Sequence, residues 1–405
     1  MTEPAPETSV TQIWDSRTRA LVRLPTSEDP EREGRRLLRL YVCGVTPYDS
    51  GHLGHAFTFL CFDLLIRWAE AQGVRVHYIQ NVTDVDDPLF ERARRDGVRW
   101  DELGEREVRL FTGDMATLGW RPPDHMPRVS QEIDAIKDAV QQLLAQGFAY
   151  RTDSVYFDVD RYPGFGELSH RTRRSMLGKL RDEGLLGEVS PEAQRGPLDF
   201  TLWRPSRPGE PAWSAPFGEG RPGWHIECTA MSRRYLGPQL DVHGGGRDLI
   251  FSHHESERAQ SESLQGEAPF ARAWMHTGMV RYEGRKMSKS LGNLVVVRQL
   301  LERMSPAAAR LALLSHHYRR DWEWSWERSE QPQRLVADVA ALVGRAPLAG
   351  AGRPPGELPD AFAAALDADL DTAGAIRALR RAVTAGDAGA ARWMGSILLG
   401  AAALA

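Results

Sequence analysis

The sequence predicts an α/β fold built around a parallel sheet, and three consecutive segments near the start of the chain support this prediction. Leu37–Cys43 is an apolar run broken only by Arg39, which is typical of a buried strand. Phe57–Ala71 repeats apolar residues at helical spacing, and Gly73 follows it. Val74–Val82 is a second strand-like run. Strand, loop, helix and strand in this order make a βαβ unit, in which ligands bind at the carboxyl ends of the strands.

The later segments extend this pattern. Helical spacing predicts helices over Trp100–Trp120 and Ile133–Gln146, and Tyr150–Asp158 indicates a strand or hairpin. Further strands are expected at Gln239–His243, just before three glycines, and at Met275–Val280. The pattern becomes helical again from residue 297.

These segments divide the chain into five predicted parts. A polar lead-in precedes a large α/β domain with a Pro-, Gly- and Arg-rich insertion, and a helical stem, a Gly/Pro/Ala-rich linker and a short Ala/Leu-rich helical segment follow. The predicted bounds are 1–36 for the lead-in, 37–295 for the α/β domain with its insertion at about 120–222, 296–345 for the stem, 346–359 for the linker and 360–405 for the last segment.

Composition limits the class of protein. The chain has 405 residues, of which 42% are apolar and 26% charged, and its net charge of −4 does not indicate nucleic-acid binding. No apolar run approaches the ~20 residues that cross a bilayer, and the polar N-terminus lacks a secretory pattern. Three cysteines do not indicate a disulfide scaffold. We therefore expect a monomeric cytoplasmic protein with reduced thiols and no membrane partner.

Two short motifs indicate that the protein binds a nucleoside triphosphate. His52-Leu53-Gly54-His55 lies on a loop that enters the first helix, where imidazole N–H groups and the helix N-terminus contact phosphate oxygens well. Gly54 would let an adenosine approach the backbone. Lys286 and Lys289, in the sequence Lys-Met-Ser-Lys-Ser, would clamp a pyrophosphate. Either motif alone also suits an ordinary surface loop. Together, in this order, they resemble the paired ATP motifs of class I aminoacyl-tRNA synthetases and their relatives, and this resemblance implies attack of a carboxylate on an α-phosphorus.

A set of soft and borderline ligands has the chemistry of a zinc site. Cys43 ends the first strand, and Cys228 lies far along the chain. His253 and Glu257 are four residues apart and would share one face if that stretch is helical. Two thiolates, an imidazole and a carboxylate suit tetrahedral zinc. From spacing alone, two buried cysteines and a core histidine are the more common arrangement. Cys61 lies on an apolar helix face and is interpreted as a core residue.

An acidic cluster follows the second strand. Asp84, Asp86 and Asp87 would suit a metal site, or they would cap a helix and form salt bridges beside the pocket. We favour capping and salt bridges.

Several long strings go beyond these single residues. They are Tyr41-Val42-Cys43-Gly44 followed by Thr46 and Tyr48-Asp49, Asn81-Val82-Thr83-Asp84-Val85-Asp86-Asp87, Gly223-Trp224-His225-Ile226-Glu227-Cys228, and Gly244-Gly245-Gly246-Arg247-Asp248-Leu249-Ile250-Phe251-Ser252-His253-His254-Glu255. Together they resemble the cysteinyl-tRNA synthetase family of class I aminoacyl-tRNA synthetases. The similarity runs from about residue 38 to about residue 330 and continues weakly through 365–371.

This resemblance implies a fold and a set of roles. The fold is a Rossmann-like parallel sheet of the class I synthetase type, with an inserted subdomain and a C-terminal helical domain. Zinc would be held by Cys43, Cys228 and His253, and Glu257 is a possible fourth ligand. The implied contacts to cysteine, ATP and the adenylate are Cys43, Gly44, Val45, Thr46, Gly54, Thr58, Asn81, Val82, Thr83, Trp224, Gly246, Arg247, Asp248 and Val280.

Two branches of the family must be separated. One charges transfer RNA, and a shortened branch joins cysteine to the amine of glucosaminyl-inositol in the mycothiol pathway. Three features resemble the shortened branch: only about 34 residues follow Asp371, Pro47 follows Thr46 in the first loop, and the stretch from Arg310 to Trp324 is similar. Other residues resemble the transfer-RNA branch, namely His243, Glu257 and Pro197–Phe200.

The resemblance also implies a reaction in two steps. The cysteine carboxylate would attack Mg²⁺-bound ATP to give cysteinyl-adenylate and pyrophosphate, and the aminosugar amine would then displace AMP to form an amide. With transfer RNA as the alternative acceptor, the product would be an ester. A catalytically silent relative that binds adenylate or RNA is a third hypothesis, but the intact phosphate motifs disfavour it.

Overall fold

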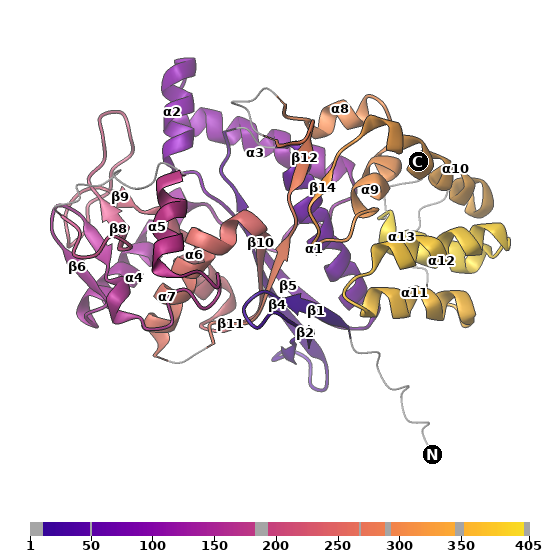
Figure 1. Ribbon diagram of the computed structural model, residues 1–405, viewed down its shortest axis with the longest axis horizontal. Helices are drawn as coiled ribbons and strands as arrows, with labels where there is room; N and C mark the ends of the chain where they lie inside the picture. The colour runs from indigo at the N-terminus through magenta and orange to yellow at the C-terminus, as the bar shows by residue number, and fades with distance from the viewer. Residues whose placement is uncertain are drawn as a thin grey trace.

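Four parallel strands form the centre of the chain, in the order β11–β10–β4–β5 (Figure 1). The computed structural model describes residues 11–48, 51–182, 193–266, 269–287 and 293–344, and 352–400, with the backbone alone at Lys286. The strands span Arg36–Val45 (β4), Arg75–Val82 (β5), Leu240–Gly246 (β10) and Ala271–Thr277 (β11). The predicted parallel sheet is therefore confirmed. A short strand, β3 (Ser27–Glu28), pairs antiparallel with the start of β4.

The two faces of strand β4 enter two separate cores. Leu38, Leu40 and Val42 pack with helix α1 (Leu53–Ala71), whereas Tyr41 and Cys43 pack with helix α6 (Trp224–Leu236) and the elements around it. Because both faces are covered, the strand is apolar almost throughout, as the sequence predicted. The sheet is a layer between two sets of helices.

Helix α1 begins four residues before the predicted start. The His52 side chain accepts hydrogen bonds from two backbone N–H groups of the first turn, at Gly54 (3.0 Å) and His55 (3.3 Å), and so caps the helix at Leu53. A capping imidazole leaves no signal in apolar spacing. The helix ends as predicted just before Gly73, whose φ is +77°.

The insertion forms its own antiparallel sheet. Its strands are β6 (Ala149–Arg151), β7 (Val155–Phe157), β8 (Phe200–Arg204) and β9 (Arg221–Pro222), in that order. The predicted hairpin at Tyr150–Asp158 is confirmed by the pairing of β6 with β7. Around this sheet lie helices α4 (Ile133–Ala145), α5 (Arg173–Asp182), α6 and α7 (Glu255–Gln265) (Figure 1).

Three helices near the site were not predicted as helices. They are α2 (Asp87–Asp96), α6 and α7. Helix α2 buries only Leu89, Phe90 and Ala93, so it has little apolar spacing to detect. Helix α7 has the opposite cause: it is rich in Glu, Ser and Gln, yet its residues 255–264 are buried. Apolar periodicity cannot reveal a helix whose buried face is polar. Helix α3 (Trp100–Thr117) agrees with its prediction.

The N-terminal segment is more closely packed than a lead-in. Strands β1 (Gln12–Asp15) and β2 (Ala20–Arg23) form an antiparallel hairpin. The Asp15 carboxylate accepts a hydrogen bond of 2.9 Å from the backbone N–H of Trp274, and Ile13 is fully buried. The hairpin therefore lies against the β11 edge of the central sheet.

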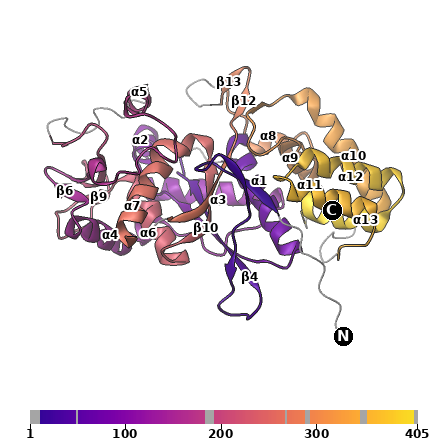
Figure 2. The same ribbon diagram turned by 60° about the horizontal axis from the view of Figure 1, so that its bottom comes forward.

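Past β11 the chain forms a small sheet and then a helical region. The sheet contains β12 (Val280–Tyr282), β13 (Arg285–Lys286) and β14 (Trp322–Glu323). The helices are α8 (Val297–Leu301), α9 (Pro306–Leu314), α10 (Glu330–Val343), α11 (Glu357–Asp367), α12 (Thr372–Thr384) and α13 (Ala388–Leu398). Figures 1 and 2 place α9–α13 on one side of the central sheet and the insertion on the other. The five-part division of the chain stays a prediction, and part of the linker, 346–351, lies outside the described residues.

Within the described ranges, no helix combines the length and the apolar character required to pass through a bilayer.

A buried ion pair joins the helical region to the sheet layer. The Arg310 guanidinium on α9 contacts the Asp63 carboxylate on α1, and both side chains are fully buried. Asp63 also accepts hydrogen bonds from the Arg67 side chain (2.8 Å) and the Arg121 backbone (2.6 Å), while Arg310 donates to the carbonyl of Leu398 at 2.7 Å. Burial alone would raise the pKa of Asp63, but the guanidiniums of Arg310 and Arg67 hold it below its usual value.

We expect Arg310→Met to lower the free energy of unfolding by about 3–5 kcal/mol, because it leaves a buried carboxylate without its main cation. Denaturant titration followed by circular dichroism measures this change. The matched control is Arg334→Met: Arg334 pairs with Glu330 on the surface of α10, and its loss should cost less than about 1 kcal/mol. Equal losses in the two variants would contradict the importance assigned to the buried pair.

Candidate active site

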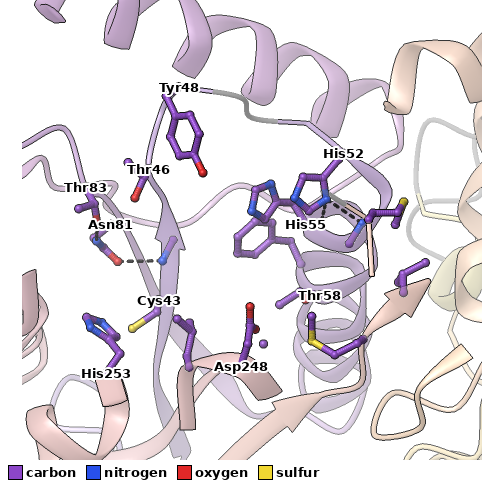
Figure 3. Close-up of a pocket in the computed structure, with 18 of the residues that line it drawn as sticks. Cys43, Thr46, Tyr48, His52, His55, Thr58, Asn81, Thr83, Asp248 and His253 are labelled. Atoms are coloured by element: carbon purple, nitrogen blue, oxygen red, sulfur yellow. Dashed lines mark hydrogen bonds between the residues drawn. The ribbon is translucent and has the colours of Figure 1, made fainter. Parts of the chain in front are cut away.

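A cavity of about 390 Å³ opens at the carboxyl ends of the central strands (Figure 3). The predicted site residues that line it are Cys43, Gly44, Thr46, His52, Gly54, His55, Thr58, Asn81, Thr83, Trp224, Cys228, Gly246, Asp248, His253 and Val280. These residues come from distant parts of the chain and meet because parallel strands end at one edge of the sheet. Figure 3 shows His52 and His55 on one side of the cavity and Cys43 and His253 on the other.

The floor of the cavity depends on a close approach between β4 and β5. A Cβ atom at Gly44 would lie 1.7 Å from the carbonyl oxygen of Asn81, so only glycine fits there. The Gly44 N–H donates to the Asn81 side chain (2.9 Å), and the same side chain donates to the Thr83 hydroxyl (3.1 Å). Asn81 thereby fixes the ends of both strands.

The two histidines of the first motif have different surroundings. Because the Nδ1 of His52 accepts the capping hydrogen bonds, a neutral His52 carries its proton on Nε2. The two rings stack with centroids 3.8 Å apart. Burial lowers the pKa of His55 to about 4, so this imidazole is neutral near pH 7. His55 can therefore donate a hydrogen bond to a phosphate but does not carry a full positive charge.

The predicted nucleotide contact of Gly54 stays a prediction, and the structure gives this glycine a second role. A Cβ atom at this position would lie 2.9 Å from the capping ring of His52. The glycine therefore makes room for the helix cap, besides lining the cavity.

The second phosphate motif is described only in part. Lys289 lies outside the described residues, as does the side chain of Lys286, whose backbone belongs to β13. Met287, between them, is 5% exposed and lines the cavity. The motif therefore begins at the cavity wall, and the clamping role of its lysines stays a prediction.

Four buried donor groups could together hold a metal ion. Ligand atoms of Cys43, Cys228, His253 and Glu257 all lie within 4.8 Å of one another. The Glu257 carboxylate is 3.3 Å from the Cys43 sulfur and 3.0 Å from the His253 Nε2 atom. A second combination shares Cys43 and Glu257 and adds His243 and His254. The first set matches the ligands expected from the sequence, including Glu257, and three of its members line the cavity.

The charges of this set suit a divalent cation. Burial would raise the pKa of Glu257, but His243 and His253 hold it well below its usual value, so this buried group is a carboxylate. Burial and the neighbouring Cys228 raise the pKa of the Cys43 thiol. Two thiols and a carboxylate in contact repel each other when ionised, and a bound Zn²⁺ would relieve that repulsion. The donor chemistry therefore fits zinc.

Trp224 covers the metal set on the cavity side. Its ring stacks on His253 with centroids 4.2 Å apart, and the side chain is 36% exposed, so it is not a core tryptophan. The Nδ1 atom of His253 lies 2.9 Å from the Nδ1 atom of His225, which orients the ring from behind. Cys61, in contrast, is buried in the α1 core as expected.

Three residues expected to contact ligands do not line the cavity. Val45 and Val82 face each other across the β4–β5 ladder and are buried. Arg247 points toward the loop before β14, where it donates to Asp321 at 2.9 Å. Side chains alternate along a strand, so Val45 and Val82 face away from the cavity that their neighbours line. Arg247 begins the short helical turn Arg247–Leu249 that follows β10.

The acidic cluster behaves as predicted. The Asp86 carboxylate caps helix α2, and Asp87 pairs with Arg204 and Arg221 at 2.6 Å each. Asp84 accepts hydrogen bonds from Ser130. Within the described residues, these three carboxylates do not form a group of potential metal ligands.

Several lining residues were not identified from the sequence. They are Tyr48, Phe59, Leu249, Gly278, Met279, Met287 and Leu294. Gly278 is required because a Cβ atom there would lie 2.1 Å from the carbonyl oxygen of Arg320. Tyr48, Leu249 and Met287 lie within the motifs quoted above, and a glycine next to a strand end was the available signal for Gly278. The remaining three are apolar residues without a distinguishing pattern.

Comparison with known proteins decides the family. Residues 30–334 match the family described as tRNA synthetases class I (C) catalytic domain. The chain belongs to this family. Relatives named L-cysteine:1D-myo-inositol 2-amino-2-deoxy-alpha-D-glucopyranoside ligase include one from Thermobispora bispora, 50% identical over 79% of each chain, and one from Kribbella flavida, 44% identical over 93% of this chain and 90% of the relative. The predicted resemblance is confirmed.

Solved structures of this class share the fold. A Mycobacterium tuberculosis methionyl-tRNA synthetase in complex with methionyl-adenylate superposes with a TM-score of 0.60 at 17% identity, covering 89% of this chain and 88% of the other. The LeuRS of Agrobacterium radiobacter K84 in a ternary complex with tRNA superposes with a TM-score of 0.62 at 13% identity, covering 92% and 83%. The class I fold predicted from the sequence is confirmed.

We expect the purified protein to contain about one zinc ion per chain, and Cys228→Ser to lose most of it, because a hydroxyl is a much poorer zinc ligand than a thiolate. Elemental analysis of the purified protein measures the metal. The matched control is Cys61→Ala, whose thiol lies in the α1 core and should leave the metal content unchanged. If the wild-type protein contains no transition metal after purification in zinc-containing buffer, the assignment is contradicted.

The neutral His55 predicts a pH-dependent stability. Its pKa is about 4 when folded and about 6.5 when unfolded, so below pH 6.5 the unfolded state takes up the proton first. This residue should therefore cost the wild type about 3 kcal/mol as the pH falls from 7 to 4, and His55→Asn should lack that part of the loss. Urea titrations of both proteins at pH 7 and pH 4 measure the difference. Parallel pH profiles would show that His55 is not buried as a neutral ring.

Proposed function

We propose that this protein is an ATP-dependent ligase that activates L-cysteine as cysteinyl-adenylate and transfers the cysteinyl group to the amine of glucosaminyl-inositol. The observation that carries the proposal is one cavity whose opposite walls hold a two-thiol metal set and a helix N-terminus with two imidazoles. The relatives are similar to this chain over most of its length, and their names support the choice of substrates.

Selection of cysteine would rest on the metal set. When bound to Cys43, Cys228 and His253, zinc supplies an affinity for thiolate sulfur that a serine hydroxyl does not share. Glu257 would hold the set together as a fourth ligand or as a neighbouring anion. Trp224 closes this side of the cavity and would keep water from a labile mixed anhydride.

Activation would occur at the other wall. The cysteine carboxylate attacks the α-phosphorus of Mg²⁺-bound ATP, and pyrophosphate leaves. The Nε2–H of His52, the neutral ring of His55 and the N-terminus of α1 would stabilise the developing charge. Lys286 and Lys289 would bind the departing pyrophosphate. Thr46 and Thr83, at adjacent strand ends, would hold the small zwitterion, and Thr58, Gly246, Asp248 and Val280 would contact the nucleotide.

Transfer RNA is the second candidate acceptor. The family description itself names transfer-RNA synthetases, and a metal set of four donors that includes Glu257 is the arrangement expected of the transfer-RNA branch. Both candidates share the activation step, so only the acceptor separates them. Under either one, we propose a monomeric cytoplasmic enzyme with small molecules as its substrates or co-substrates.

We expect purified protein to catalyse cysteine-dependent exchange of pyrophosphate into ATP and to release AMP when glucosaminyl-inositol is added. Serine should support exchange on the order of 10³-fold less well. Replacing the aminosugar with transfer RNA separates the two acceptors. AMP release with transfer RNA alone would favour the synthetase, and the absence of exchange with any amino acid would refute both candidates.

His55 should be necessary for activation. We expect His55→Asn to slow the exchange by roughly 10²–10³-fold, because it removes a preorganised donor from the phosphate site. His170→Asn is the matched control, since His170 is exposed and its ring lies 3.0 Å from the backbone carbonyl oxygen of Ser16, away from the phosphate site. Equal rates for the two variants would contradict the role of His55.

A further inference from the structure

A second cavity of about 510 Å³ lies directly beside the first. Thr46, Tyr48 and Trp224 line both cavities, so the two share a wall. The second cavity is bounded by the start of α2, the sheet of the insertion and the start of α6. Figure 3 shows Thr46 and Tyr48 where the chain leaves β4, on the far side of the first cavity from Thr58. A molecule bound in the second cavity would therefore contact a molecule bound in the first cavity near Thr46.

Aromatic rings form part of its surface. Phe165 stacks on Phe200 with centroids 6.2 Å apart and meets Phe251 edge-on at 6.5 Å, and all three line the cavity together with Trp224. Flat apolar faces of this kind suit the C–H faces of a sugar or cyclitol ring. These rings exclude water, and they can bind an uncharged part of a ligand.

The charged groups of the cavity are mainly acidic. They are Asp86, Asp87, Glu91 and Asp199, against Arg204 and Arg221. Both arginines bind Asp87 at 2.6 Å, so their charges are already engaged. A phosphate chain would meet a net negative wall here, whereas a cationic amine with hydroxyl groups would be attracted. The chemistry of the wall therefore favours an amino-polyol over a nucleic acid.

Asp86 lines the second cavity next to Thr46, which lines both cavities. One of its carboxylate oxygens accepts a hydrogen bond from the Thr46 hydroxyl at 3.2 Å, and the other accepts the Asp87 backbone N–H at 2.9 Å. Each oxygen can accept one more hydrogen bond. Burial, and then the neighbouring Asp87, raise the pKa of Asp86 to about 6, which suits a group that exchanges protons near neutral pH.

We propose that the second cavity binds the amino-polyol acceptor. Asp86 is then the catalytic carboxylate that binds the ammonium group of the acceptor and takes a proton from it. This inference rests on the proposed function and names the acceptor site that the function requires. In the transfer step, Asp86 takes one proton from the ammonium group. The amine lone pair then forms the C–N bond, the bond from the carbonyl carbon to the phosphate oxygen breaks, and AMP leaves with that electron pair. The second N–H proton passes to water.

The test separates the two half-reactions in Asp86→Asn. Asparagine also caps helices, so the start of α2 should be retained. We expect cysteine-dependent pyrophosphate exchange to stay within about twofold of the wild type, while ligation to glucosaminyl-inositol falls by roughly 10²–10³-fold in kcat. Asp387→Asn, which changes the capping aspartate of α13 in the same way, is the matched control and should not affect either half-reaction.

A second variant tests the cavity independently of Asp86. Phe165→Ala should raise the KM for glucosaminyl-inositol about tenfold and leave the exchange reaction unchanged, because it removes part of the aromatic surface only. Unimpaired ligation by Asp86→Asn, or loss of exchange along with ligation, would overturn the inference, as would an unchanged KM in Phe165→Ala. If the wild type exchanges pyrophosphate but never ligates the aminosugar, the proposed function fails as well, and the two failures are thereby distinguished.

Discussion

The site depends on one buried carboxylate, Glu257. It lies in a protein interior, where an unpaired anion is costly, and it is tolerated because Cys43, His243 and His253 surround it. These partners come from β4, β10 and the turn before α7, so the carboxylate ties together elements that are some two hundred residues apart in sequence. Helix α7 is polar and yet buried because its side chains have polar partners. Besides Glu257, Glu255 accepts the backbone N–H of Ser169 at 2.7 Å, and Gln260 accepts the Thr229 hydroxyl at 2.5 Å.

The parallel sheet places this cluster opposite a second functional group in the same cavity. Because β4, β5, β10 and β11 all end at one edge, the metal set and the N-terminus of α1 are held on opposite walls of one cavity. One wall would recognise a sulfur atom and the other would stabilise phosphate charge, and a small amino acid can span both.

The insertion adds the second cavity. Its antiparallel sheet and the starts of α2 and α6 place an aromatic and acidic surface next to Thr46, where the activated carbonyl would lie. Arg204 and Arg221 engage Asp87, whereas Asp86 keeps acceptor capacity toward the cavity. Of these two adjacent carboxylates, Asp87 is thus held by ion pairs, whereas Asp86 is available to a substrate.

The sequence by itself determined the βαβ unit, the parallel sheet, the helical C-terminal region, the family and most of the cavity lining, because apolar periodicity and long motifs are local properties of the chain. It did not determine helix α7, the cap formed by His52, or the reason for Gly54 and Gly278, since each depends on contacts with distant residues. Spacing alone could not separate a metal set from two core cysteines. Only the tertiary structure brought Cys43, Cys228, His253 and Glu257 within reach of one ion, and only it turned Val45, Val82 and Arg247 away from the cavity, because the direction of a side chain is set by the packing around it.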